Sequence, residues 1–598
     1  DHDGVPDAID PHPSVANPSD KSVLTENGTS NGISNGSGNV AQSQQDLRFS
    51  CNQDAHAPKD LQRLSRTQYE NTLQDLMQHS VSAATATAVM QAAQPALSAF
   101  PDDAISKDAP FAVMDQSVSQ AHADAFMNIG TSVAQALTSS ANRVSELVGS
   151  CASAKSATAS TMQSCISTFI DSFGKRALRH SLNADEKSFY LEVYAASGSA
   201  IDAQGLADVI TVMLNAPDFI YRVEFGAGQA DSSGTLFQLN DYEIATRLAY
   251  EFWQTAPDDD LLAAADRGEL STDDGYQKAL DRVLADPRAG LGLEQFAREW
   301  LDLDDMRPLD ALVGTPVFDA FAGANKPNAN LKEEMIQDLT DSIAFHAFSD
   351  QGTLAEWLES PYSFARTQDL ASIYGTSVWD GKSAPPRFPD GQRAGLITRA
   401  ALLSTGTANS NPILKGVLIR ERLLCDKLGP PPPNAAGKLP DLSGNKTERQ
   451  AVEALTEVPG SNCAGCHATQ INPLGYATEG FDALGRVRSK ENVYDAQGHV
   501  TVSLAVDTSS VPHVWASDAT PSNGASDLTA LLTDSGKVEA CFAREWMRYS
   551  EARTESEDTD GCGLETVRST LANGQSMKEA LRQFALLPQF RQRFVPAS

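Results

Sequence analysis

The residues best suited to chemistry stand late in the chain, where two cysteines and a histidine form the string Cys463-Ala464-Gly465-Cys466-His467. Two thiols three positions apart on one helical turn can both add to the vinyl groups of a single haem, and the adjacent imidazole then faces the iron. The string therefore predicts one covalently attached c-type haem with His467 as the proximal ligand of its iron.

Two other interpretations of the same string are weaker. A zinc site needs a second Cys or His pair nearby, and His499 and the remaining cysteines are distant in sequence. A redox-active cysteine pair is typical of a βαβ setting, which the sequence lacks. Because the string occurs once, a two-haem architecture would require a second haem from a partner.

Three neighbours of the motif are candidates for haem binding. Pro473 has a fixed φ and is expected to shape the loop that returns over the ring. Arg486 and Arg488 carry guanidinium groups that suit the haem propionates, although ordinary ion pairs are the competing interpretation. The second ring nitrogen of His467 is expected to donate to a backbone carbonyl.

The sequence leaves the sixth coordination position of the iron open. Met547 is the first candidate, with Met577, His499 and His513 behind it. A Met ligand raises the reduction potential and favours electron transfer, whereas an open position favours peroxide or oxygen chemistry. The competing interpretation of Met547 is that it packs in a core beside Trp546.

The elements that must position these residues are mostly helices, which predicts a mainly α, multidomain fold. Capping boxes that start helices occur at Asn183/Glu186, Asn240/Glu243 and Ser576/Glu579. The apolar spacing of Arg63–Met77 places Leu64, Leu73, Leu76 and Met77 near one helical face. The alternating run Val500–Val506 predicts a strand, so we expect at most a small sheet near residues 493–506.

Composition and patterning divide the chain into six predicted segments. They are a partial calcium-binding repeat at 1–12, a flexible Ser/Asn/Gly linker at 13–50, N-terminal helical domains at 51–230, a central helical domain at 231–380, a c-type haem domain at 381–498 and a C-terminal helical domain at 499–598.

The first segment places carboxylates at Asp1, Asp3, Asp7 and Asp10 around a turn at Gly4. Ca²⁺ prefers six to eight oxygen ligands, so such a cluster can converge on one ion. The string resembles the end of a thrombospondin type-three calcium repeat, and the alternative is an acidic disordered terminus.

Bulk properties indicate an exported protein. The formal charge of −32 repels nucleic acid, which excludes a nucleic-acid partner and suits a basic one. No run of about 18 apolar residues is present, so we expect no transmembrane segment. The chain starts within a motif, so we expect a processed product; an anchor upstream of residue 1 is compatible with the sequence.

Eight cysteines are present, and six lie outside the haem motif. An even remainder in an exported chain indicates disulfides, with 15 possible connectivities for six cysteines. Local spacing favours Cys151–Cys165 and Cys541–Cys562, which leaves Cys51–Cys425. Buried free thiols are the alternative.

The segment from Cys463 to Arg488 resembles the haem segment of a multidomain monohaem cytochrome-like family of planctomycetes and proteobacteria, built from consecutive domains of unknown function. Asn472 departs from the resemblance, because the family usually has Asp there. The resemblance spans about residues 60–598 and implies an architecture more than a reaction. Further matches follow the family's order at Arg63–Met77, Asn215–Glu224, Asp241–Asp258, Ser410–Gly416, Trp546–Tyr549 and Pro588–Arg591.

Three functions fit the sequence. The first is extracytoplasmic electron transfer to or from a surface or extracellular redox partner. The second is a haem-dependent peroxidase or oxygenase acting on an external substrate, and the third is a cell-surface assembly component with a structural haem domain. A haem carrier needs only about one small domain, so the large remainder indicates docking or recognition.

Overall fold

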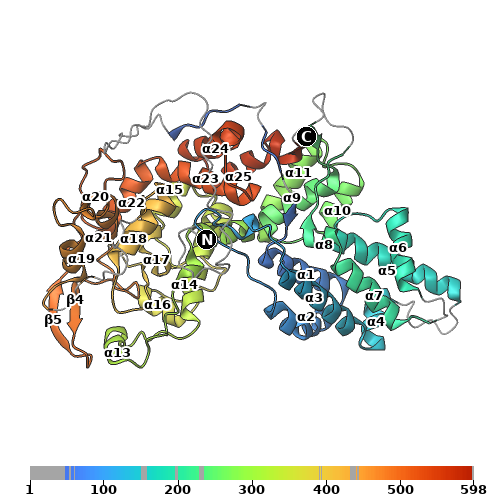
Figure 1. Ribbon diagram of the computed structural model, residues 1–598, viewed down its shortest axis with the longest axis horizontal. Coiled ribbons are helices and arrows are strands. Elements are labelled where there is room, and N and C mark those ends of the chain that lie inside the picture. The colour runs from blue at the N-terminus through green and yellow to red at the C-terminus, as the bar shows by residue number, and fades with distance from the viewer. Residues whose placement is uncertain are drawn as a thin grey trace, which may run out of the picture. The chain divides into compact units, whose positions relative to one another are not determined.

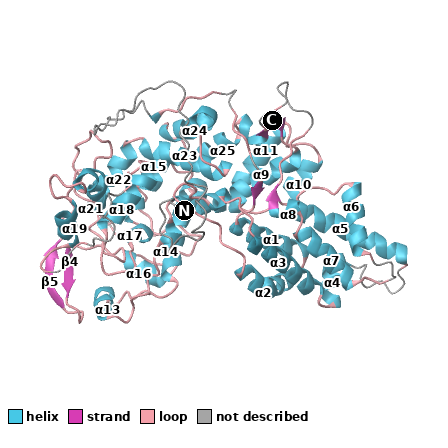
Figure 2. Ribbon diagram, viewed as in Figure 1, coloured by secondary structure: helices cyan, strands magenta, loops and turns pink. Residues whose placement is uncertain are grey.

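The architecture consists almost entirely of helices, which confirms the mainly α fold class (Figure 2). The calcium candidates Asp1, Asp3, Asp7 and Asp10 and most of the linker lie outside the residues that the structure describes, so the calcium site stays a prediction. The computed structural model describes residues 47–52, 56–59, 61–149, 158–195, 200–227, 235–389, 391, 393–430, 440 and 444–595.

An N-terminal bundle has its own hydrophobic core, in which Leu73, Ile129 and Ile210 are fully buried. Its first helix begins at a capping box between Ser65 and Gln68, and the predicted apolar face is buried. The bundle comprises α1 (Arg66–Ser80), α2 (Ala83–Ser98), α3 (Gln120–Thr138), α4 (Ala141–Val148), α5 (Ala159–Leu178), α6 (Ala184–Tyr194), α7 (Ala203–Leu214) and α8 (Pro217–Ile220), and Figure 1 shows α1 to α7 gathered together.

A second, larger core runs through the rest of the described chain and joins its central and C-terminal helices. Phe296 and Trp300 of one helix pack edge to face against Phe542 and Trp546 of another. The helices of this core are α9 (Asp241–Trp253), α10 (Asp259–Asp266), α11 (Asp273–Ala285), α12 (Gly290–Trp300), α14 (Leu331–Ala344), α15 (Leu354–Leu358), α16 (Gln368–Tyr374), α17 (Ala400–Leu403), α22 (Ala525–Asp534), α23 (Lys537–Glu551), α24 (Glu557–Ala572) and α25 (Met577–Ala585). α13 (Pro316–Ala322) packs in a small separate cluster with Ala483 and Leu484.

The predicted helix starts are confirmed where the sequence placed them. Reciprocal capping boxes form at Asn183 before α6 and at Asn240 before α9. Ser576 caps α25 by accepting a hydrogen bond from the backbone N–H of Glu579. No helix among the described residues is long and apolar enough to cross a membrane.

Three two-stranded antiparallel sheets are present in the described chain. The predicted strand is confirmed as β5 (Val500–Ala505), which pairs with β4 (Lys490–Tyr494) in a hairpin. The other two sheets join distant segments, and no local pattern predicted them. They pair β1 (Gln62–Arg63) with β2 (Tyr221–Arg222), and β3 (Leu236–Gln238) with β6 (Gln592–Phe594).

The disulfides differ from those predicted from local spacing. Cys51 bonds to Cys562, and Cys425 bonds to Cys541, so the expected Cys541–Cys562 and Cys51–Cys425 pairs are wrong. Cys165 is also disulfide-bonded, whereas its predicted partner at position 151 lies outside the described residues. The prediction from local spacing was wrong because tertiary packing places cysteines next to each other that are 511 and 116 positions apart in the sequence.

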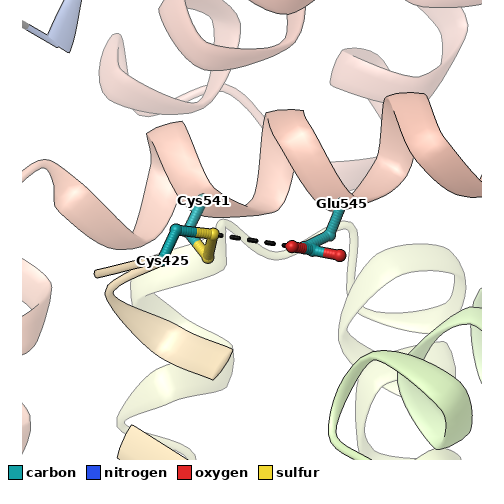
Figure 3. Close-up of side chains that lie close together, drawn as sticks. All are labelled: Cys425, Cys541 and Glu545. Atoms are coloured by element: carbon teal, nitrogen blue, oxygen red, sulfur yellow. Dashed lines mark hydrogen bonds between the residues drawn. A yellow bond between two sulfur atoms is a disulfide. The ribbon is translucent and has the colours of Figure 1, made fainter. Parts of the chain in front are cut away.

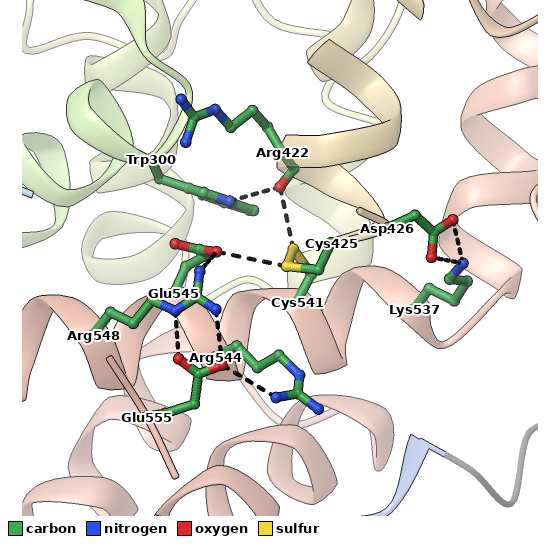
Figure 4. The surroundings of a disulfide bond; sticks show 10 residues. All are labelled: Trp300, Arg422, Cys425, Asp426, Lys537, Cys541, Arg544, Glu545, Arg548 and Glu555. Carbon is green, nitrogen blue, oxygen red and sulfur yellow. Dashed lines mark hydrogen bonds and ion pairs between the residues drawn. A yellow bond between two sulfur atoms is a disulfide. The ribbon is translucent and has the colours of Figure 1, made fainter. Parts of the chain in front are cut away.

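The Cys425–Cys541 disulfide anchors α23 to residue 425, which follows the π-helical turn Ile419–Leu423 (Figure 3). Glu545 lies one turn further along α23, with an oxygen 3.7 Å from the sulfur of Cys425. Because both sulfurs are in the disulfide, neither offers a thiolate to a metal. The backbone carbonyl of Arg422 accepts a 2.7 Å hydrogen bond from the indole of Trp300 beside this bond (Figure 4).

Candidate haem-binding site

The Cys-x-x-Cys-His string lies in a group of short helices that pack on one another (Figure 1). A π-helical turn, His467–Ile471, joins the helix that carries Cys466 to the helix that begins at Asn472. Such turns interrupt the regular helical ladder and occur often at functional sites. The group comprises α18 (Pro412–Leu418), α19 (Glu448–Thr456), α20 (Ala464–Cys466) and α21 (Asn472–Tyr476).

Two glycines allow the predicted haem segment, residues Cys463–Arg488, to approach α18 closely. A Cβ atom at Gly475 would lie 1.8 Å from the carbonyl oxygen of Pro412, and one at Gly416 would lie 2.0 Å from that of Ile471. Both contacts are with backbone, which cannot rotate away. Only glycine at both positions permits this crossing, which fixes the backbone on both sides of the π-helical turn.

The two motif cysteines are the free thiols of the described chain. Cys463 and Cys466 are partly exposed, and each remaining described cysteine is in a disulfide. The two thiols flank one helical turn, and no described protein group bonds to either sulfur. They therefore fit the thioether chemistry of covalent haem attachment.

Asn472 orients His467, the predicted proximal ligand. The Nδ1 atom of His467 lies 2.9 Å from the side-chain oxygen of Asn472, which is fully buried. Since that oxygen can only accept, Nδ1 carries the proton, and Nε2 keeps a free lone pair for the iron. The expectation of a backbone carbonyl as the partner of His467 is corrected to a side-chain amide.

A second layer of hydrogen bonds fixes Asn472 itself. Its Nδ2 atom donates to the hydroxyl of Thr456 at 2.9 Å and to the carboxylate of Glu457 at 2.7 Å. The hydroxyl of Tyr476 donates to the same carboxylate at 2.7 Å. Burial, together with this bond to Glu457, raises the pKa of Tyr476, which stays a neutral donor. The orientation of His467 is thus fixed by Asn472, and Asn472 in turn by Thr456 and Glu457.

The other predicted neighbours have protein partners. Pro473 is buried in the first turn of α21, and its carbonyl accepts a 2.7 Å hydrogen bond from Ser510. Arg486 pairs with Asp482 at 2.7 Å, and Arg488 pairs with Glu479 at 2.8 Å. These ion pairs engage both guanidinium groups, so a role in binding propionates stays a prediction.

A buried ionic cluster beside α18 escaped sequence analysis. Lys415, Glu448, Glu479 and Glu491 lie around the hydroxyl of Ser410 and the guanidinium of Arg488. Burial raises the pKa of Glu491 to about 7, and it also raises that of Glu448. Burial lowers the pKa of Lys415. No spacing signal marks these residues, because three separate segments contribute them.

The methionine candidates for the sixth ligand are core residues. Met547 is buried between α23 and α24, where a Cβ atom at Gly563 would lie 2.3 Å from its methyl group. Met577 is fully buried. His499 is 79% exposed and pairs with Asp495 at 3.1 Å in the β4–β5 turn. The remaining candidate, His513, lies in a loop that is hydrogen-bonded to the haem segment.

Comparisons with known protein families find four consecutive domains in this chain. Together the matches cover more than half of it and end at residue 491, so they do not reach the C-terminal segments that the resemblance included. Nothing matches significantly among curated proteins or among solved structures. The four matches are PSD3, Protein of unknown function (DUF1587), at 62–139; PSD5, Protein of unknown function (DUF1595), at 165–224; PSD4, Protein of unknown function (DUF1592), at 239–376; and PSCyt3, Protein of unknown function (DUF1588), at 393–491.

Each match contains a segment through which the sequence resembles the multidomain family. The opening-helix segment Arg63–Met77 lies in the first match, Asn215–Glu224 in the second and Asp241–Asp258 begins the third. The fourth match contains the whole string from Cys463 to Arg488. The order of the domains is the order that the resemblance implied.

Proposed function

This chain belongs to the multidomain cytochrome-like family of planctomycetes and proteobacteria, and we propose that it is an extracytoplasmic monohaem c-type cytochrome. It passes electrons to or from a redox partner at the cell surface or outside the cell. One observation carries this proposal: Cys463 and Cys466 are free, while the other described cysteines are in disulfides, and they stand beside a histidine with a free Nε2.

Residues of this chain attach the haem and orient its histidine ligand. Cys463 and Cys466 form the thioether links, and His467 offers Nε2 to the iron while Asn472 keeps its Nδ1 protonated. A haem bound there supplies one-electron chemistry. The partial exposure of the motif leaves it open to the approach of a partner protein.

Compartment and partner chemistry support the same proposal. Two disulfides among the described residues are typical of an oxidising environment outside the cytoplasm. The formal charge of −32 favours association with a basic partner, at a rate that falls as salt screens the attraction.

Covalent attachment is tested by expressing the full chain in a host that matures c-type cytochromes. We expect one haem per chain that survives acid–acetone extraction, with a pyridine haemochrome spectrum typical of two thioether links. Cys463→Ala with Cys466→Ala should abolish retention of the haem.

The matched control is Cys425→Ala with Cys541→Ala, which also removes two cysteines but leaves the motif intact. That variant should keep its haem. Haem that is extracted from the unaltered protein, or retained by the Cys463→Ala/Cys466→Ala variant, would overturn the proposal.

A further inference from the structure

The loop at residues 506–524, between β5 and α22, is fixed against the haem segment by one buried arginine. Arg420 donates from Nε to the carbonyl of Gln470 at 2.8 Å. Its Nη2 donates to the carbonyls of Pro512 and His513, each at 3.1 Å. One guanidinium group therefore connects residue 513 with a residue that lies one helical turn after His467.

Two more contacts fix the same loop. The hydroxyl of Ser510 donates to the carbonyl of Pro473 at 2.7 Å. Arg449 covers the ring of Tyr476 at 4.4 Å and donates to the carbonyls of Asp507 and Ser509. These contacts and Arg420 hold the loop to both ends of the segment from Gln470 to Tyr476.

The imidazole of His513 makes no hydrogen bond or ion pair with the part of the chain that the structure describes. Its Nδ1 atom is buried without a hydrogen-bond partner, and its Nε2 makes no hydrogen bond or ion pair within the described chain. The backbone of His513 has φ 47°, which is unusual for a residue other than glycine. Every other described histidine has an ion pair, hydrogen bond or ring contact for its imidazole, namely His56, His79, His122, His180, His346, His467 and His499.

We propose that His513 would supply, together with His467, the second protein ligand to the iron of a haem attached at Cys463 and Cys466. The inference rests on the proposed function, because it requires the haem that Cys463 and Cys466 attach. Neutral imidazole is a common ligand of iron. His467 and His513 lie in two segments that Arg420 joins, and neither Nε2 atom has a hydrogen bond within the described chain. Met547 and Met577, in contrast, are buried in the core.

A histidine in the sixth coordination position bears on the choice between electron transfer and peroxide or oxygen chemistry. A haem with two histidine ligands is six-coordinate and low-spin, so it has no open position for peroxide or dioxygen. It therefore favours the electron-transfer proposal over the peroxidase or oxygenase alternative. It also implies a lower reduction potential than a Met ligand would give.

The test uses the full-length haem-loaded protein and its His513→Ala variant. We expect the unaltered protein to show the visible and electron paramagnetic resonance spectra of low-spin haem with two imidazole ligands, and no prompt carbon monoxide binding when reduced. His513→Ala should lose the low-spin spectrum and bind carbon monoxide promptly. Added imidazole should restore the low-spin spectrum.

The matched control is His499→Ala, which removes an exposed imidazole in the neighbouring hairpin and should leave both spectra unchanged. Circular dichroism of His513→Ala should match that of the unaltered protein, and the rescue by imidazole separately shows an intact pocket. A low-spin spectrum that persists in His513→Ala overturns the assignment and leaves the proposed function standing. High-spin haem in the unaltered protein also overturns it, whereas a chain that attaches no haem overturns the proposed function itself.

Discussion

At the scale of single residues, the contact that matters most joins Asn472 to His467. A carboxylate at position 472 would draw the Nδ1 proton toward itself, give the imidazole anionic character and stabilise ferric iron. The amide that this chain carries accepts the same hydrogen bond without a charge. An amide in place of the family's usual Asp therefore keeps the orientation of His467 and would change the electronic effect of this imidazole on a bound iron.

Asn472→Asp is expected to lower the midpoint potential of the haem. If the stronger hydrogen bond favours the oxidised state by about 1 kcal/mol, the shift is roughly 40 mV. A spectroelectrochemical titration of the full-length protein measures it. Asn462→Asp, in the exposed residue before Cys463, introduces the same charge without the hydrogen bond and should shift the potential much less. Equal shifts in the two variants would contradict the role of Asn472.

At the scale of elements, the haem segment depends on how α18 and α21 cross. The crossing requires glycine on each helix, because a Cβ atom on either would overlap a backbone carbonyl of the other segment. Glycine inside a helix is otherwise unfavourable. Its cost in helix propensity is offset here by the close packing of two segments beside His467.

Gly475→Ala is expected to destabilise the protein by about 1–3 kcal/mol, since the backbones must separate to admit the methyl group. Thermal or urea unfolding of the haem-loaded protein measures this loss, and the absorption of the haem reports any displacement of His467. Gly465→Ala, within the motif itself, has open space around the new Cβ and should be neutral or slightly stabilising. Similar unfolding curves for the two variants would count against the packing argument.

The helix α12 carries a buried carboxyl group, that of Glu299. Glu299 accepts hydrogen bonds from the backbone N–H of Ala112 at 3.1 Å and from Gln295 at 2.6 Å. Burial raises the pKa of Glu299 to about 8. The folded protein therefore keeps this proton up to about pH 8, whereas the unfolded chain loses it near 4.5.

Because the folded state binds the extra proton, the contribution of Glu299 to stability falls as pH rises between about 4.5 and 8. The slope is at most about 1.4 kcal/mol per pH unit. Glu299→Gln should remove this part of the pH dependence, as measured by urea unfolding at pH 5 and pH 8. Glu192→Gln, on the exposed surface of α6, should leave the pH dependence unchanged. An unaltered slope in Glu299→Gln would show that the carboxyl is ionised in the folded state.

At the scale of the whole molecule, the segment at the start of the described chain is fastened to its C-terminal helices. Cys51 bonds to Cys562 across 511 positions, and Lys59 pairs with Glu551 at 3.0 Å. The β3–β6 sheet adds a further link between distant segments. These contacts link the two ends of the described chain at the second core, to which the central helices, the predicted haem segment and the C-terminal helices all contribute.

Replacement of Cys51 and Cys562 by Ser is expected to lower the unfolding free energy by roughly 2–5 kcal/mol, because the unfolded chain regains conformational freedom. The haem should stay attached. The Cys425–Cys541 disulfide closes a loop of 116 positions instead of 511, so chain entropy predicts that Cys425→Ser with Cys541→Ser costs less stability, by about 1 kcal/mol. Urea unfolding of both double variants tests the ranking, and a reversed order would mean that local packing outweighs chain entropy.

The sequence alone determined the features that depend on neighbours within one or two helical turns. Local spacings identified the capping residues Asn183 and Asn240 and the strand from Val500, and the structure confirms them. The Cys-x-x-Cys-His motif is a signal of the same local kind. The mainly α class follows from the same patterns. The family resemblance added the order of the domains, which the four matches confirm.

Only the tertiary structure decided which distant residues meet. The partner of Cys562 lies 511 positions away, and β2 pairs with a strand that begins at Gln62. The same holds for the loop that carries His513, which Arg420 joins to Gln470. Such contacts depend on how whole helices pack around shared cores, and that packing leaves no short-range pattern in the sequence. The residues that we propose attach the haem therefore stand out in the sequence, whereas the residues that orient His467 and that we propose complete the iron coordination became evident only in the folded chain.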